Sequence, residues 1–192
     1  IIWKDKVFVS SSDPKAKELL ALCLNRTTGK VLWRQVVGSG FQRDNRSNYA
    51  SPSPATDGKV VVFFYGNGDL AGFDLAGKQL WQKTVQKDVN GFAFQWTFSA
   101  SPLLHKGIVY LQVLQRDTGV RGHGKNAGNE SYLLALDPNT GKELWWKPYD
   151  GFSIVCRPSY GHGLFYVVGS IVLDHHALYA IRPGRGEIGE DR

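Results

Sequence analysis

Short apolar runs separated by polar turns follow one another along the whole chain. Between residues 50 and 85 the runs are 50–56, 60–65, 69–74 and 79–85, and the turns contain Asp57-Gly58, Gly66-Asn67-Gly68 and Ala76-Gly77. Runs of this length are typical of strands and are too short for helices, while Gly beside Asp or Asn favours tight turns. The pattern therefore predicts consecutive antiparallel strands. The segment 13–22 comes nearest to a helical pattern, but its later residues align with a strand of a later repeat, so we predict a strand there.

The strand pattern repeats along the chain. The clearest copies are LCLNRTTGKVLW at 22–33, FDLAGKQLW at 73–81 and LALDPNTGKELW at 134–145, with a weaker one, YAIRPGRGEI, at 179–188. A second apolar element precedes each copy and begins near residues 1, 53, 101 and 157. Four short strands in a repeat of roughly 40–50 residues are typical of a β-propeller blade. We therefore predict an all-β fold, a β-propeller of four-stranded antiparallel blades, with one segment, 1–192, holding units at approximately 1–37, 49–87, 97–148 and 154–192.

Three kinds of residue recur at matched positions in these units, which predicts a structural role for each. The Trp that closes each copy is expected to fill the space between neighbouring blades, the Gly to allow the turn, and the Asp to cap it. These positions are Trp33, Trp81, Trp145, Gly29, Gly77, Gly141, Asp74 and Asp137.

The segment ALDPNTGKELW at 135–145 resembles the repeat of the pyrroloquinoline quinone (PQQ)-like propellers. The resemblance covers nearly the whole chain and is weakest in the fourth unit, where Arg182 replaces the Asp and Glu190 stands where Trp would be. It implies a ring of seven or eight blades, so we expect the chain to be part of such a ring rather than a closed four-bladed one. It also implies an exported protein of the periplasm or cell envelope, although no signal-peptide pattern is visible.

The same resemblance leaves two classes of function open. Some members are quinoprotein dehydrogenases, which bind PQQ with Ca²⁺ through Glu, Asn and Asp oxygens and often use a vicinal disulfide. Others are non-catalytic, such as the propeller lipoprotein of the outer-membrane assembly machinery and uncharacterised exported propellers. Cys23 and Cys156 are not vicinal, and the repeat already explains Asp74 and Asp137.

We therefore predict a non-catalytic scaffold that binds a protein, peptide or small ligand through its loops or central funnel. For this scaffold we predict no catalytic, cofactor-binding or metal-binding residue. The alternative is part of a PQQ- and Ca²⁺-dependent alcohol or sugar dehydrogenase.

An inserted loop at 116–131 interrupts the third unit, and it is rich in Gly and polar residues. Long loops on a rigid scaffold often carry function. One hypothesis is that Arg116, Arg121 and His123 contact an acidic partner or ligand, and the other is a solvated decoration. Trp146 follows the repeated Trp, where the first two units have Arg34 and Gln82. It is either an exposed contact or packs beneath the inserted loop.

Charge and composition add limits rather than a function. The formal net charge is +6, but the Lys and Arg are scattered, which argues against nucleic-acid binding. No apolar run approaches the ~20 residues of a membrane span, while a lipid anchor, the oligomeric state and a Cys23–Cys156 disulfide stay open. The triplet Asp174-His175-His176 is a poor metal site, because adjacent side chains in a strand point to opposite faces.

Overall fold

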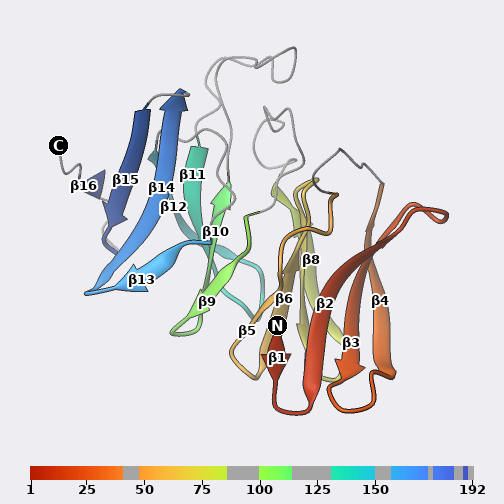
Figure 1. Ribbon diagram of the computed structural model, residues 1–192. Coiled ribbons are helices and arrows are strands. Elements are labelled where there is room, and N and C mark those ends of the chain that lie inside the picture. The colour runs from red at the N-terminus through yellow and green to blue at the C-terminus, as the bar shows by residue number, and fades with distance from the viewer. Residues whose placement is uncertain are drawn as a thin grey trace.

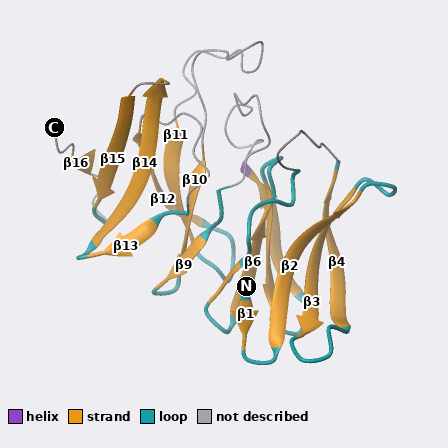
Figure 2. Ribbon diagram, in the orientation of Figure 1, coloured by secondary structure: helices purple, strands orange, loops and turns teal. Residues whose placement is uncertain are grey.

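The computed structural model describes residues 1–40, 48–85, 100–113, 131–149, 157–172, 175–183 and 188–189, the last stretch and part of 169–176 by their backbone alone. The sixteen elements within these ranges are all strands, which Figure 2 draws in orange. The predicted all-β class is confirmed.

The strands form four antiparallel sheets, and in each sheet the strands pair in chain order. Figure 1 shows these four blades following one another from the N-terminal to the C-terminal end. The first blade holds β1 (Ile2–Trp3), β2 (Lys6–Asp13), β3 (Glu18–Asn25) and β4 (Val31–Ser39). The second holds β5 (Ala55–Thr56), β6 (Val60–Phe64), β7 (Asp69–Asp74) and β8 (Gln79–Thr84). The third holds β9 (Leu103–His105), β10 (Ile108–Val113), β11 (Ser131–Leu136) and β12 (Glu143–Tyr149). The fourth holds β13 (Ser159–Gly161), β14 (Leu164–Val172), β15 (His175–Ile181) and β16 (Ile188–Gly189).

The strands differ from the sequence prediction most clearly in two places. The run 50–56 contributes only Ala55 and Thr56 to β5, since Pro52 and Pro54 have no N–H to donate to a ladder. Within 13–22, β2 ends at Asp13 and β3 begins at Glu18, so a turn lies where the helical pattern was strongest. The fourth blade ends with β16, whose Ile188 pairs with Ile181.

Because strands alternate in direction, the meander places two turns of each of the first three blades, and the first turn of the fourth, at one end of the molecule. We call this end the turn face, and it comprises residues 4–5, 26–30, 57–59, 75–78, 106–107, 139–142 and 162–163. It lies at the lower edge of the blades in Figure 1. Neighbouring blades meet here, since a Cβ added at Gly58 of the second blade would collide with the ring of Trp3 in the first.

The hydrophobic core lies between the stacked faces of the blades. One cluster joins the first two blades, and its fully buried members include Phe8, Cys23, Val61, Phe63 and Phe73. A second cluster continues from the second blade through the third to the fourth, with Val62, Leu111, Leu134, Phe165 and Ile181 among its buried residues. A blade cannot cover both of its own apolar faces, so its neighbours stabilise it.

Candidate functional site

The repeated Trp joins each of the first two blades to the turn of the next. The Trp33 indole lies against Gly77, where an added Cβ would come within 2.7 Å of the ring, and its Nε1 donates to the Leu75 carbonyl at 3.3 Å. Trp81 repeats the arrangement one blade further on. Its ring lies against Gly141, 2.6 Å from an added Cβ, and its Nε1 donates to the Pro138 carbonyl at 2.6 Å. In both junctions the acceptor is the residue directly after the capping Asp.

A β-bulge directs each of these Trp side chains. In the first three blades the ladder between the third and fourth strands shifts register just before the Trp, which leaves one residue of the fourth strand without a partner. The extra residues are Leu32, Leu80 and Leu144, which are 47%, 39% and 46% exposed. A bulge increases the local twist and re-aims the next side chain. The sequence pattern Leu-Trp gave no hint of it.

The turn before each Trp is held by one side chain. Asp137 Oδ1 accepts the backbone N–H groups of Asn139 and Thr140 at 2.7 and 3.0 Å. Asp74 Oδ1 accepts those of Ala76 and Lys78, both at 2.9 Å. Asn25 does the same in the first blade. These oxygens are engaged in the backbone of their own turns.

Two repeat positions, Trp145 and Gly29, make no Trp–Gly contact between blades within the described residues. Trp145 is half-buried, packs against the second core cluster and lies 5.8 Å from the Tyr110 ring. The turn glycine expected to face it, Gly186, lies outside the described residues. Gly29 has a φ of +69° and no atom within 4 Å of an added Cβ, so its turn is open where those of Gly77 and Gly141 are covered.

Trp146 is the candidate contact residue that the structure describes. It pairs with Leu134 across the ladder and is 50% exposed. Its ring meets the buried Tyr132 edge to face, with centroids 5.7 Å apart, and Tyr132 lies one residue after Ser131, where the inserted loop ends. Trp146 is therefore an exposed aromatic side chain with a fixed neighbour. The other candidates, Arg116, Arg121 and His123, lie outside the described residues.

A stack of aromatic and basic side chains on the first strands of the third and fourth blades was not predicted. His105 ends strand β9, and its ring stacks on Tyr160 with centroids 4.0 Å apart. Its Nε2 is buried and has no hydrogen-bond partner among the described residues. Lys106 Nζ lies 5.6 Å from the Tyr160 centroid. The parallel between LLHKG and SYGHG in the sequence could have indicated that these residues meet.

A buried polar pair also lies between the third and fourth blades. Gln112 is fully buried, and its Nε2 donates to the Tyr149 hydroxyl at 3.1 Å, while its Oε1 has no partner among the described residues. Burial raises the pKa of Tyr149, whose ring contacts that of Tyr179. Sequence reasoning missed this pair, because the apolar strands around Gln112 and Tyr149 indicate only a core.

Two features of a quinoprotein site, a cation-binding cluster and a vicinal disulfide, can be compared with the described residues. Nowhere in the described ranges do three His, Cys, Asp or Glu side chains gather as a metal site. Cys23 is a buried free thiol, and burial raises its pKa, while Cys156 lies outside the described residues. Among the described residues there is also no helix long and apolar enough to cross a membrane.

Comparison with known proteins identifies the family. The model of one family, described as outer membrane protein assembly factor BamB, matches residues 4–120, which is more than half of the chain. The chain belongs to this family. The predicted relation to the PQQ-like propellers is thereby confirmed. No curated protein matches the chain.

Solved propellers of both functional classes share the fold of this BamB-family chain. The crystal structure of BamB from Moraxella catarrhalis is 15% identical with a TM-score of 0.58, and the match covers 99% of this chain and 50% of that one. A europium-containing methanol dehydrogenase is 16% identical with a TM-score of 0.66, covering 97% and 39%. The quinohemoprotein alcohol dehydrogenase from Comamonas testosteroni is 17% identical with a TM-score of 0.62, covering 98% and 33%. The chain spans half or less of each of these proteins.

Proposed function

We propose that this BamB-family chain is a non-catalytic propeller segment that binds a protein or peptide partner in the cell envelope. The observation that carries the proposal is Trp146, which is half exposed on the outer strand of the third blade and held by the Tyr132 ring. Trp is one of the residues enriched among the hot spots of protein interfaces. The family description, an outer membrane protein assembly factor, suggests a partner among outer-membrane proteins.

The repeat supports a scaffold role in another way. The carboxylates of Asp74 and Asp137 hold turns, and the indoles of Trp33 and Trp81 join blades. In a quinoprotein these residue types would be needed for the cation and the quinone. Here they are committed to the architecture, which leaves the loops and outer strands to recognise a partner.

Binding of a labelled peptide tests the proposal. The probe is an extended peptide with the sequence of one strand from an outer-membrane β-barrel, and fluorescence anisotropy measures its affinity. We expect Trp146→Ala to weaken binding by about 2 kcal/mol, or roughly 30-fold. Leu178 is the matched control, because it is 58% exposed on the fourth blade, and Leu178→Ala should leave the affinity within about twofold. Equal affinities for Trp146→Ala and the unaltered chain would remove Trp146 as the anchor.

A second experiment separates the scaffold from the dehydrogenase. The chain is incubated with PQQ and Ca²⁺, and oxidation of an alcohol or a sugar is followed with an electron-accepting dye. We expect no oxidation and no change in the quinone spectrum. Dye reduction that depends on both PQQ and Ca²⁺ would overturn the proposed function in favour of the quinoprotein class.

A further inference from the structure

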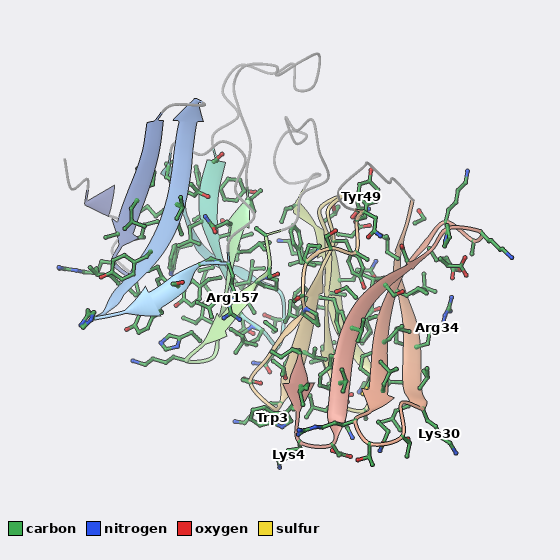
Figure 3. The ribbon with its side chains drawn as sticks, viewed as in Figure 1. Trp3, Lys4, Lys30, Arg34, Tyr49 and Arg157 are labelled. Atoms are coloured by element: carbon green, nitrogen blue, oxygen red, sulfur yellow. The ribbon has the colours of Figure 1, made fainter. Side chains whose placement is uncertain are left out.

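Exposed lysines recur on the turn face of the first three blades. The turn between the first and second strands of these blades presents Lys4, Lys59 and Lys106, and the turn between the third and fourth presents Lys30, Lys78 and Lys142; all six are exposed. Figure 3 shows Lys4 and Lys30 on opposite sides of the first blade, both at this end. The fourth blade adds the exposed His162 in its first turn. The apparent scatter of charge in the sequence thus becomes a repeated arrangement on one end of the blades.

The carboxylates on this face are mostly turned inward onto the backbone. Asp57 accepts two backbone N–H groups of its own turn, as Asp74 and Asp137 do. Asp5 lies 3.6 Å from Lys6 Nζ, and Glu143 follows Lys142 on the exposed start of β12. Within the described residues, none of the six lysines forms an ion pair. Lys106 Nζ lies over the Tyr160 ring, and the other five exposed lysines can face an anionic partner.

An exposed leucine stands two residues after a lysine in each of three blades. The pairs are Lys30 with Leu32, Lys78 with Leu80 and Lys142 with Leu144, and these leucines are the bulge residues described above. Because a bulge residue leaves the ladder, the leucine is not drawn into the core with its neighbours. The first blade adds Val31, which is 57% exposed. Cationic and apolar side chains thus alternate along the rim of the turn face.

We propose that the turn face binds the surface of an anionic phospholipid membrane. Lysines near such a surface are attracted to the lipid headgroups, and short apolar side chains beside them enter the boundary between headgroups and acyl chains. A soluble polyanion would form ion pairs with the lysines, but it would bury no apolar surface against Leu32, Leu80 and Leu144. The combination of charge and exposed apolar side chains therefore favours a lipid surface. This proposed lipid site does not use Trp146, and it does not depend on the proposed protein partner.

Sedimentation with lipid vesicles tests the proposal. The chain is mixed with vesicles of phosphatidylcholine alone or of phosphatidylcholine with phosphatidylglycerol, and the bound fraction is measured at increasing NaCl. We expect binding only to the anionic vesicles, and weaker binding as salt rises. The double variant K30E/K142E should bind at least roughly 30-fold more weakly, since each lysine near an anionic leaflet contributes about fivefold and each new carboxylate is repelled by the leaflet. The triple variant L32S/L80S/L144S should bind roughly tenfold more weakly with the same salt dependence.

The matched control is K15E/K17E, which makes the same change in net charge at the opposite end of the first blade. Both lysines are exposed in the turn between β2 and β3, and their reversal should change vesicle binding by less than about threefold. All substituted positions are exposed, so circular dichroism and thermal melting should match those of the unaltered chain. Equal losses in K30E/K142E and K15E/K17E would overturn the site in favour of an effect of net charge. Vesicle binding that is indifferent to the leucine changes, together with tight binding of soluble polyglutamate, would overturn the lipid surface in favour of an acidic protein.

Discussion

The indole of Trp81 lies against Gly141 of the next blade and donates its Nε1–H to the Pro138 carbonyl at 2.6 Å. The same relationship joins Trp33 to Gly77 and Leu75. Each junction thus has two separable parts: a glycine that leaves room for a ring, and a carbonyl that receives its hydrogen bond. The first two predictions address these parts separately.

Gly141→Ala should be much more damaging than Gly29→Ala. Both glycines have nearly the same positive φ, +67° and +69°, so an alanine costs about 1–2 kcal/mol of backbone strain at either. Only at Gly141 would the new Cβ meet an indole, which adds about 1–3 kcal/mol of overpacking. Urea denaturation gives the two free energies of unfolding. Equal losses of unfolding free energy in the two variants would mean that the Trp81 indole moves aside without cost.

Trp81→Phe should destabilise the chain by about 1–3 kcal/mol, because it leaves the buried Pro138 carbonyl without its donor. Trp33→Phe is the comparison. Its hydrogen bond is longer, at 3.3 Å, and its indole is only half-buried, so we expect a smaller loss. Thermal melting of both variants measures the difference. A Trp33 variant that loses more stability than the Trp81 variant would contradict this ranking.

Tyr65→Phe should be neutral or stabilising at pH 7 and should flatten the loss of stability in alkali. Tyr65 is fully buried, and its hydroxyl has no partner among the described residues, so removing it removes a desolvation cost. Burial raises the pKa of Tyr65 above the ordinary 10.0. Above about pH 10 the unfolded chain loses this proton while the folded chain keeps it, so the free energy of unfolding falls.

Unfolding of both chains at pH 7 and at about pH 11 checks the Tyr65 prediction. The decline between the two pH values should be smaller in Tyr65→Phe, because phenylalanine has no proton to lose. A clear loss of stability at pH 7 would show instead that the hydroxyl makes a favourable interaction.

Substitutions of Gln112 and Tyr149 should have strongly coupled effects on the free energy of unfolding. Tyr149→Phe leaves the buried Gln112 amide without its hydroxyl partner and should cost about 1–3 kcal/mol. Gln112→Leu leaves the Tyr149 hydroxyl alone and should also destabilise, although it removes an Oε1 that is already unsatisfied. The double variant Q112L/Y149F removes both polar groups and should be more stable than the sum of the single changes predicts. A double-mutant cycle measures this coupling, and additive losses would argue against the hydrogen bond.

The sequence predicted the blades well because their information is local and repeated. Turn residues such as Asp74 and Gly77 fix where strands begin and end, and several copies of one pattern confirm each other. What the sequence could not predict depends on register and on neighbours. The bulge at Leu32, Leu80 and Leu144 arises because the fourth strand has one residue more than its partner needs, and no residue type marks it.

The site-level contacts were harder to predict for the same reason. Gln112 and Tyr149 are 37 positions apart, and nothing near either of them in the chain indicates the other. His105 meets Tyr160 across two blades, which requires the stacking of blades to be known first. Trp146 stood out only because it broke the repeat, and its half-exposed position follows from the ladder pairing with Leu134.

The contact between the Trp of one blade and the glycine turn of the next has a consequence for how propellers gain blades in evolution. A single unit carries both halves of the joint, since Trp81 reaches forward to the third blade while the turn at Gly77 receives Trp33 from the first. A duplicated unit therefore brings with it both the Trp and the glycine turn that the contact needs, and no neighbouring blade has to change to accommodate it. Gene duplication can lengthen a chain of this design one unit at a time, and each new copy is free to vary its outer strand and loops while the joint stays fixed.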